Sequence, residues 1–234
     1  VWEFVSEDHG ESWREGRSQQ VVEQRPEGIW RRNYLVGWGD PETGWLLLMG
    51  NEGIFKGDHP VEDGMRNWFP VYRVSKDGGR TWAVESPVIQ EGPPGRYTSS
   101  RPLEGVEVGR NAAFLGDMGC RPIRSREGLI LVPLQICPVG PDGQYWNPGG
   151  GYTFHECAVL LGKWTPEGRI VWNLSERVAL DPSRSTRGCL EPTLAEMPDG
   201  RILMVMRGSN EGRFDPDCRK PGYRWRSVSN DGGR

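Results

Sequence analysis

The sequence predicts an all-β fold assembled from repeated antiparallel units of about 70 residues. Two observations support this prediction. The 234 residues include 33 Gly, 19 Pro and 11 Trp, a composition that suits short strands joined by many turns. In addition, no long segment has the periodicity of an amphipathic helix, whereas two kinds of turn motif recur along the chain.

The first recurring element is a turn motif with the pattern S-x-D-x-G-x-[ST]-W. It occurs at residues 6–13 and 75–82, and a third copy begins at Ser229. The Ser and Asp side chains can bond the backbone amides of the turn, and Gly supplies a positive φ. The Trp is expected to pack the turn against the sheet. Because the copies begin 69 and then 154 residues apart, we expect one intervening unit without the motif, with residues 162–172 in its place.

The second recurring element is a predicted β-hairpin. Residues 119–134 contain Gly-Cys-Arg-Pro, a Glu-Gly pair and an apolar run, and residues 188–206 repeat this order with Asp-Gly at the turn. Pro122 and Pro192 are 70 residues apart, which is the same period. A weaker copy covers residues 33–49. Each copy predicts two strands joined by a tight turn.

The turn motif resembles the Asp box, or BNR repeat, of the sialidase (neuraminidase) superfamily. The resemblance implies a β-propeller of four-stranded antiparallel blades, six in the whole protein, with each box between the two outer strands and remote from the active site. At this period the chain holds about three blades. We therefore expect residues 1–234 to be one partial propeller domain, with both ends of the propeller outside it. A three-bladed protein that oligomerises is the alternative.

The segment from Cys189 to Arg207 resembles the sialidase segment in which a glutamate opens one strand and an arginine ends the next, 16 residues later. The resemblance implies that Glu191 is the general base paired with a tyrosine nucleophile, and that Arg207 is one of three arginines that bind the substrate carboxylate. A phenol with a pKa near 10 needs such a base. The planar guanidinium suits bidentate binding of a carboxylate.

Three further residues are candidates for substrate binding. Arg121 occupies the position in its repeat that Glu191 occupies in the next, so it is expected to face the same funnel, although the neighbouring arginines also fit an ordinary charged loop. His155 and Glu156 follow a Gly-rich segment and precede an apolar strand, so a loop could carry both to the substrate. A lone His is more often structural.

Composition and motifs exclude several other classes of protein. The net charge of −3, with interspersed signs, lacks the basic face that nucleic acid requires, so no nucleic-acid partner is expected. No apolar run is long enough for a membrane segment. No phosphate-binding or dinucleotide-binding glycine motif is present, and five widely spaced Cys with three His do not predict a metal site. We therefore expect neither cofactor nor metal.

The resemblance thus implies a retaining exo-glycosidase that removes terminal sialic acid or a related acidic sugar from a glycan. The resemblance places the other two arginines, the acid/base aspartate and the tyrosine before residue 1 or after Arg234, so this chain alone is expected to be inactive. It also favours an extracellular or periplasmic location. One alternative is a non-catalytic propeller that binds glycans or proteins through Trp38, Trp68 and Trp146. The other is a polysaccharide lyase with His155 as base.

Overall fold

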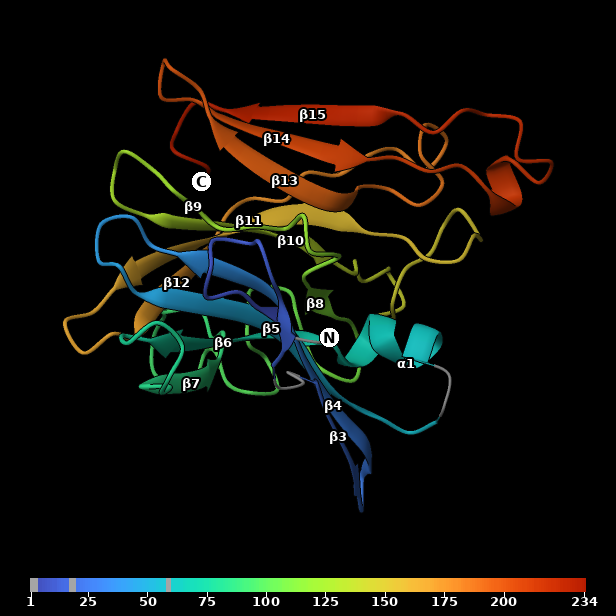
Figure 1. Ribbon diagram of the computed structural model, residues 1–234. Helices are drawn as coiled ribbons and strands as arrows, with labels where there is room; N and C mark the ends of the chain where they lie inside the picture. Colours follow the sequence, from blue (N-terminus) through green and yellow to red (C-terminus); the bar gives the residue numbers. More distant parts are fainter. Residues whose placement is uncertain (1–3, 17–19, 58–59) are drawn as a thin grey trace.

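The computed structural model describes residues 4–16, 20–57 and 60–234. Its strands form a two-stranded hairpin and three larger antiparallel sheets, which lie face to face as successive blades of a partial β-propeller (Figure 1). The prediction of an all-β propeller is therefore confirmed. The helical elements of the described part are short: α1 (Pro60–Asn67) and the 3₁₀ turn η1 (Gly212–Phe214). Neither is long and apolar enough to cross a membrane.

The first blade contains the strand order β3-β4-β5-β6-β7. The predicted hairpin over residues 33–49 is formed by β4 and β5, and the turn motif at residues 75–82 joins β6 to β7, the two outer strands. Strand β3 pairs with the first half of β4 and extends the sheet, an element that the sequence pattern did not predict. The bounds are β3 (Gln20–Arg25), β4 (Gly28–Gly39), β5 (Leu46–Phe55), β6 (Phe69–Ser75) and β7 (Val84–Pro87).

The second and third blades contain the other two predicted hairpins. In the second blade, the innermost position is divided between β8 (Ala113–Phe114) and β9 (Ile123–Arg124), which both pair with β10 (Ile130–Ile136). Its outer strands are β11 (Glu156–Trp164) and β12 (Ile170–Leu174), joined by a plain turn where the motif was expected to be missing. The third blade has β13 (Leu190–Glu196), β14 (Ile202–Arg207) and β15 (Arg224–Ser229).

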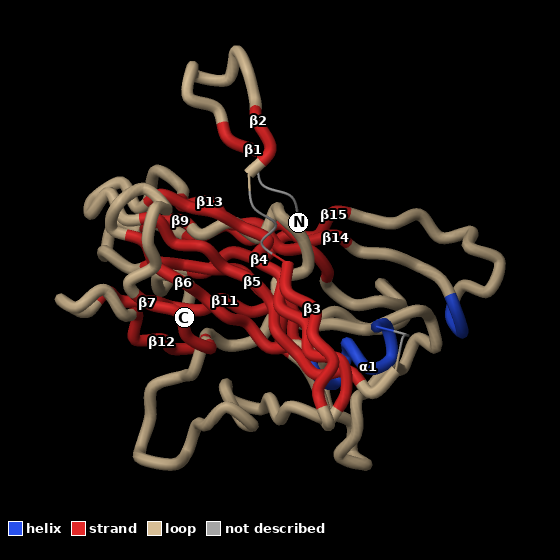
Figure 2. Tube along the Cα trace, turned by 60° about the horizontal axis from the view of Figure 1, so that its bottom comes forward, coloured by secondary structure: helices blue, strands red, loops and turns tan. Residues whose placement is uncertain are grey.

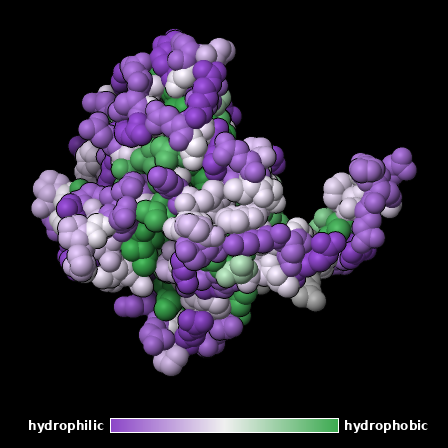
Figure 3. All heavy atoms as spheres, turned by 90° about the vertical axis from the view of Figure 1, so that its left-hand side faces the viewer, coloured by the Kyte–Doolittle hydropathy of each residue, from purple (hydrophilic) through white to green (hydrophobic). Residues whose placement is uncertain are grey.

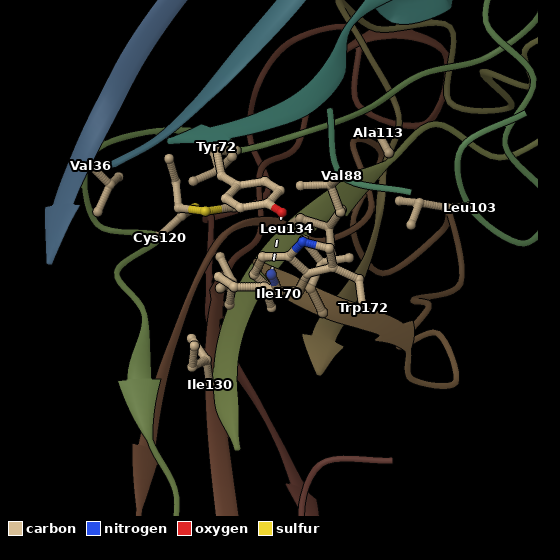
Figure 4. Close-up of a cluster of buried hydrophobic side chains, with 14 of the residues drawn as sticks. Val36, Tyr72, Val88, Leu103, Ala113, Cys120, Ile130, Leu134, Ile170 and Trp172 are labelled. Atoms are coloured by element: carbon tan, nitrogen blue, oxygen red, sulfur yellow. Dashed lines mark hydrogen bonds between the residues drawn. The ribbon is translucent and has the colours of Figure 1, made fainter. Parts of the chain in front are cut away.

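The second blade is buried on both faces. Side chains alternate between the two faces of a strand, and every residue of β10 is buried. Ile130, Val132, Leu134 and Ile136 pack with Leu47, Met49 and Val74 of the first blade, in a cluster that also holds Tyr72 and Trp172 (Figure 4). Leu131 joins Val159 and Leu161 of β11 and packs with Leu194, Met204 and Met206 of the third blade. The core therefore consists of two apolar layers, one on each side of β10 and β11.

Buried polar side chains also join the first two blades. Asn51 of β5 donates to the Leu115 carbonyl and accepts from the Leu115 amide, both at 2.9 Å. Within the first core layer, the Ile170 amide donates to the Tyr72 hydroxyl at 3.3 Å (Figure 4). Because these groups are shielded from water, the hydrogen bonds avoid the cost of unpaired buried polar atoms and set how the sheets align.

The three copies of the turn motif share one set of hydrogen bonds. In the second copy, the Ser75 hydroxyl accepts from the amides of Asp77 and Gly79, at 3.3 and 2.8 Å, and donates to the Asp77 carboxylate at 2.7 Å. Asp77 also accepts from the Thr81 amide and hydroxyl, at 2.9 and 2.6 Å. Gly79 has a φ of 89°, a backbone conformation that residues with a side chain rarely adopt. The predicted role of Ser, Asp and Gly is therefore present in the structure.

The predicted packing of the motif Trp against a sheet does not hold for the first copy. Trp13 lies in the hairpin of β1 (Phe4–Val5) and β2 (Arg14–Glu15), which projects from the rest of the molecule (Figure 2). Its side chain is exposed, and its indole donates to the Gly10 carbonyl at 3.2 Å. Trp82 of the second copy lies under the Arg73 guanidinium, 3.7 Å from the ring centroid. The motif therefore forms its turn without a sheet beneath it.

Asp77→Ala is expected to lower the melting temperature at neutral pH, because Asp77 accepts three hydrogen bonds within the turn. The bonds from Thr81 and Ser75 lower the pKa of Asp77 below its ordinary value of 3.8. A carboxylate with a lowered folded-state pKa stabilises the fold above its ordinary pKa and loses that contribution as the pH falls further. The difference between wild type and variant should therefore shrink below about pH 4.

Thermal melts from pH 7 to pH 3 measure this effect, with Asp217→Ala as the control, since Asp217 is exposed and pairs with Arg219, which is exposed as well. Equal melting temperatures for wild type and Asp77→Ala at pH 7 would contradict a structural role for the turn.

Candidate functional site

Glu191 and Arg207 lie at the same end of two neighbouring strands. Strand β13 begins at Leu190 and β14 ends at Arg207, and both positions are on the right-hand side of the third blade in Figure 1. The Arg207 Nη1 donates to the Glu191 Oε1 at 2.7 Å. Both side chains keep contact with solvent, at 28% exposure for Glu191 and 39% for Arg207. The pairing follows from the hairpin, because its tight turn brings the open ends of the two strands together.

The backbone of Glu191 has an unusual conformation. Its φ is 49°, in the left-handed region that residues other than Gly rarely adopt. The register of β13 against β14 shifts between Leu190 and Thr193, so Glu191 lies in a β-bulge, which redirects a side chain. A left-handed residue of this kind costs about 1–2 kcal/mol. Such strain is concentrated at functional sites, where the surrounding structure holds it in place.

Gln135 from the neighbouring blade holds the Glu191 backbone. Its side-chain Oε1 accepts from the Glu191 amide at 2.7 Å, and Gln135 is buried. The same side chain lies against Gly116, where an added Cβ would come within 1.8 Å of Oε1. The absence of a side chain at Gly116 thus leaves room for Gln135 to reach Glu191. The third blade depends on the second for the position of its glutamate.

A second arginine, Arg187, joins this site, and the sequence did not predict it. Its Nη2 donates to the Thr153 hydroxyl at 2.8 Å, and its Nε lies 3.6 Å from the Glu211 carboxylate. Burial lowers the pKa of Arg187, and the positive charge of Arg207 lowers it further. The negative charges of Glu211 and Glu191 partly oppose this shift by raising the pKa. Arg187, Arg207, Glu191 and Glu211 therefore form one group of alternating charges. No motif marks Arg187, because its partners Thr153 and Glu211 lie in two loops that are far from it in the chain.

The structure places His155 in the interior rather than on an exposed loop. The ring is buried, packs edge-to-face on Phe114 with centroids 5.4 Å apart, and has its Nδ1 3.7 Å from the Cys137 sulfur. Burial lowers its pKa to about 3, with a further contribution from the charge of Arg187. The imidazole is therefore neutral at physiological pH. Its backbone connects to the site, because its amide donates to the Arg187 carbonyl at 3.1 Å.

Glu156 and Arg121 have surroundings different from those of Glu191. Glu156 accepts from Arg177 at 3.1 Å, and Arg177 also donates to the Glu104 and Gly105 carbonyls, so this pair joins the start of β11 to the loop between β7 and β8. Arg121 is exposed in the loop before β9, and its amide donates to the Gly119 carbonyl at 2.8 Å. The structure brings Glu191 and Arg207 into contact, whereas binding roles for Arg121, His155 and Glu156 stay predictions.

The site shows no arrangement for a metal ion. Within residues 4–16, 20–57 and 60–234, no three His, Cys, Asp or Glu side chains gather as a metal site would require. The five cysteines are free, and four of them are buried. The contact between Arg207 and Glu191 offers binding of an anion by arginine and transfer of a proton to or from the glutamate.

Gln135→Met is expected to destabilise the protein by about 1–3 kcal/mol, because it leaves the Glu191 amide without its buried acceptor at nearly constant side-chain volume. Hydrogen exchange at the Glu191 amide should also become faster. Urea unfolding and amide exchange measure the two effects, with the exposed Gln144→Met as control. Unchanged exchange at Glu191 would show that Gln135 does not hold this residue.

His155 is expected to make the protein less stable as the pH falls from about 6.5 towards 3. Its folded-state pKa is lowered to about 3, so the unfolded chain binds a proton in this range that the folded chain does not. His155→Gln removes this group and should flatten the dependence of the unfolding free energy on pH. Denaturant melts between pH 7 and pH 4 test it, with the exposed His9→Asn as control. Equal slopes for wild type and His155→Gln would contradict the buried neutral imidazole.

Comparison with known proteins gives similarity at the level of structure. No family model and no curated protein matches the sequence. Among solved structures, a Hadza microbial sialidase matches with a TM-score of 0.59 and 16% identity, over 99% of this chain and 38% of that one. The intramolecular trans-sialidase of Ruminococcus gnavus, solved with oseltamivir carboxylate, matches with a TM-score of 0.47 and 14% identity, over 98% and 38%. The chain spans well under half the length of these proteins and shares the fold of sialidases over the blades it contains.

Proposed function

We propose that this chain is part of a sialidase-like exo-glycosidase that hydrolyses terminal sialic acid, or a related acidic sugar, with retention of configuration. The observation that carries the proposal is the position of Glu191. A bulge and a left-handed backbone hold its carboxylate 2.7 Å from Arg207, at the open ends of the inner strands. In the sialidase fold, an acid and an arginine in these positions suit the base and the carboxylate-binding group. The S-x-D-x-G turn between the outer strands β6 and β7 further supports an Asp-box propeller.

Arg207 is proposed to bind the carboxylate of the sugar. In the free protein its guanidinium is neutralised by Glu191 on one side, and its remaining N–H groups can face an incoming anion. Arg187 adds positive charge behind it while remaining bonded to Thr153. A guanidinium held by neighbouring groups loses little freedom on binding, so the two arginines favour a planar, bidentate carboxylate.

Glu191 is proposed to act as the base for a tyrosine nucleophile. As the phenol oxygen bonds to the anomeric carbon, its proton passes to Glu191 and the glycosidic oxygen leaves with a proton from a separate acid. Water then attacks the anomeric carbon and gives a proton to the separate acid, which had lost its own, while Glu191 returns its proton to the phenolate as it leaves. A neutral tyrosine suits this chemistry, because a second carboxylate would repel the anionic substrate.

The alternatives have less support from the side chains. A lyase with His155 as base conflicts with the burial of that ring, which is 2% exposed. For a glycan-binding propeller, Trp38 packs on the first core layer and Trp68 against Phe55, with centroids 4.5 Å apart. Trp146 is the more exposed of the three candidate tryptophans, and it packs edge-to-face on Phe154. We therefore place the function at Glu191 and Arg207.

The full-length protein that contains this chain should release free sialic acid from a fluorogenic α-sialoside. Glu191→Gln is expected to lower kcat by about 100- to 10,000-fold, the usual contribution of general base catalysis. Arg207→Ala is expected to lower kcat/KM by about 100-fold, because a desolvated partner of the carboxylate is lost. Matched controls are Glu196→Gln, at the other end of β13, and Arg201→Ala, in the hairpin turn.

Thermal melts of all four variants separate a loss of activity from a loss of folding. Release of sialic acid that survives in Glu191→Gln would remove Glu191 from the mechanism. No release by the wild type from a panel of sialosides and uronosides across pH 4–8 would overturn the proposed hydrolase and favour a binding protein.

A further inference from the structure

A pocket lies on the third blade, and neither Glu191 nor Arg207 lines it. It has a volume of about 470 Å³, and its lining includes Arg184, Asn210, Lys220, Tyr223, Arg224 and Trp225. We call it the Trp225 pocket. This volume is within the range of pockets that bind small molecules. Arg224 and Trp225 of its lining begin β15, and in Figure 1 this end of β15 is on the same side of the blade as the end of β14.

The charge of the Trp225 pocket is unbalanced. Arg184, Lys220 and Arg224 line it, and no Asp or Glu does. Within the described residues none of the three forms an ion pair, although the chain as a whole carries a net charge of −3. Lys220 Nζ donates only weakly to the Ser183 carbonyl, at 3.4 Å. Asp181, outside the lining, interacts electrostatically with Arg184, and the lining itself keeps an excess of positive charge that an anionic ligand would balance.

Aromatic rings give the pocket an apolar wall. Tyr223 and Trp225 pack edge-to-face with centroids 5.9 Å apart, and Tyr223 is 54% exposed. Arg184 lies over the Trp225 ring, 4.7 Å from its centroid, which holds the guanidinium at the pocket. The Trp225 nitrogen lies against Gly208, where an added Cβ would come within 2.3 Å. The indole therefore has a fixed position, and the exposed Tyr223 ring is free to contact a ligand.

Hydrogen bonds join the loops that line the pocket. Asn210 donates to the Pro221 carbonyl at 3.0 Å and accepts from the Thr186 amide at 3.2 Å. The pocket is a neighbour of the Glu191 and Arg207 pair, although neither of these two residues lines it. Arg224 lies directly opposite Arg207 across β14 and β15, so the two side chains start from the same face of the sheet, with Cβ atoms about 5 Å apart.

We propose that the Trp225 pocket is a binding site for an anionic sugar, meaning a pyranose ring that carries a carboxylate or a sulfate ester. The cations bind the anionic group, the Tyr223 ring contacts the C–H face of the sugar, and the wall of Asn210 limits the depth. Cations combined with an exposed aromatic ring and an amide suit a ligand that is both charged and a carbohydrate. The proposal does not depend on hydrolysis at Glu191, because the pocket has its own lining and its own charge.

Isothermal titration of the full-length protein tests the proposal with four probes: glucuronic acid, N-acetylglucosamine 6-sulfate, neutral glucose and sodium sulfate. At least one anionic sugar is expected to bind at least 10-fold more tightly than glucose and than sulfate alone. Which of the two binds better identifies the anionic group. The affinity should fall as NaCl rises from 50 to 500 mM, since exposed charges are screened.

Variants assign the binding to the pocket. Arg224→Ala and Arg184→Ala are each expected to weaken binding by 10-fold or more. Arg226→Ala, two residues further along β15 and exposed, should leave it unchanged. Arg207→Ala separates the two sites: it should leave binding in the Trp225 pocket intact even where it removes hydrolysis.

Three results would overturn the proposal. The first is that glucose binds as tightly as the anionic sugars, and the second is that sulfate alone binds as tightly as they do. The third is that Arg207→Ala loses binding while Arg224→Ala keeps it. The absence of binding by every probe up to 20 mM would overturn it as well. Failure of hydrolysis with a sialoside would leave these outcomes unaffected.

Discussion

The structure depends on the burial of the second blade between its two neighbours. Strands β10 and β11 supply apolar side chains to both faces, and each face is covered by a different sheet. A sheet that is apolar on both sides is stable only in such a stack, since either face would otherwise meet water. Figure 3, which views the molecule from the left of Figure 1, shows apolar atoms between the third blade at the top and the blades below. Burial on both faces therefore sets the order of the blades.

This stacking also places the candidate site. The inner strands of the third blade end beside the second blade, so Gln135 can reach across and bond the Glu191 amide. The left-handed conformation of Glu191 would be costly in an isolated hairpin. Here the bulge of β13 and the bond from Gln135 hold it, and the carboxylate is directed to Arg207. The packing of the core thus offsets the conformational cost of a strained residue at the open end of the strands.

Two arrangements of charge lie next to each other on the third blade. At Glu191, two arginines alternate with two glutamates, so the cations stay partnered in the absence of a ligand. In the Trp225 pocket, three cations line the wall and no carboxylate does. The first arrangement suits a group that must exchange partners during a reaction, and the second suits simple binding of an anion. Arg207 of the first arrangement and Arg224 of the second lie opposite each other, so the register of β14 against β15 fixes the position of both residues.

The sequence by itself determined the local features of this protein. The S-x-D-x-G turns, the hairpin turn at residues 199–200 and the placement of Glu191 and Arg207 at one end of that hairpin follow from residues close in the chain. The tertiary structure decided the burial of His155, the recruitment of Arg187, the bond from Gln135 and the Trp225 pocket. These features join segments that are far apart in the chain, and no local pattern distinguishes an exposed His from one that a neighbouring sheet covers. The exposed Trp13 is a further example, because its surroundings depend on which sheet lies beside the turn.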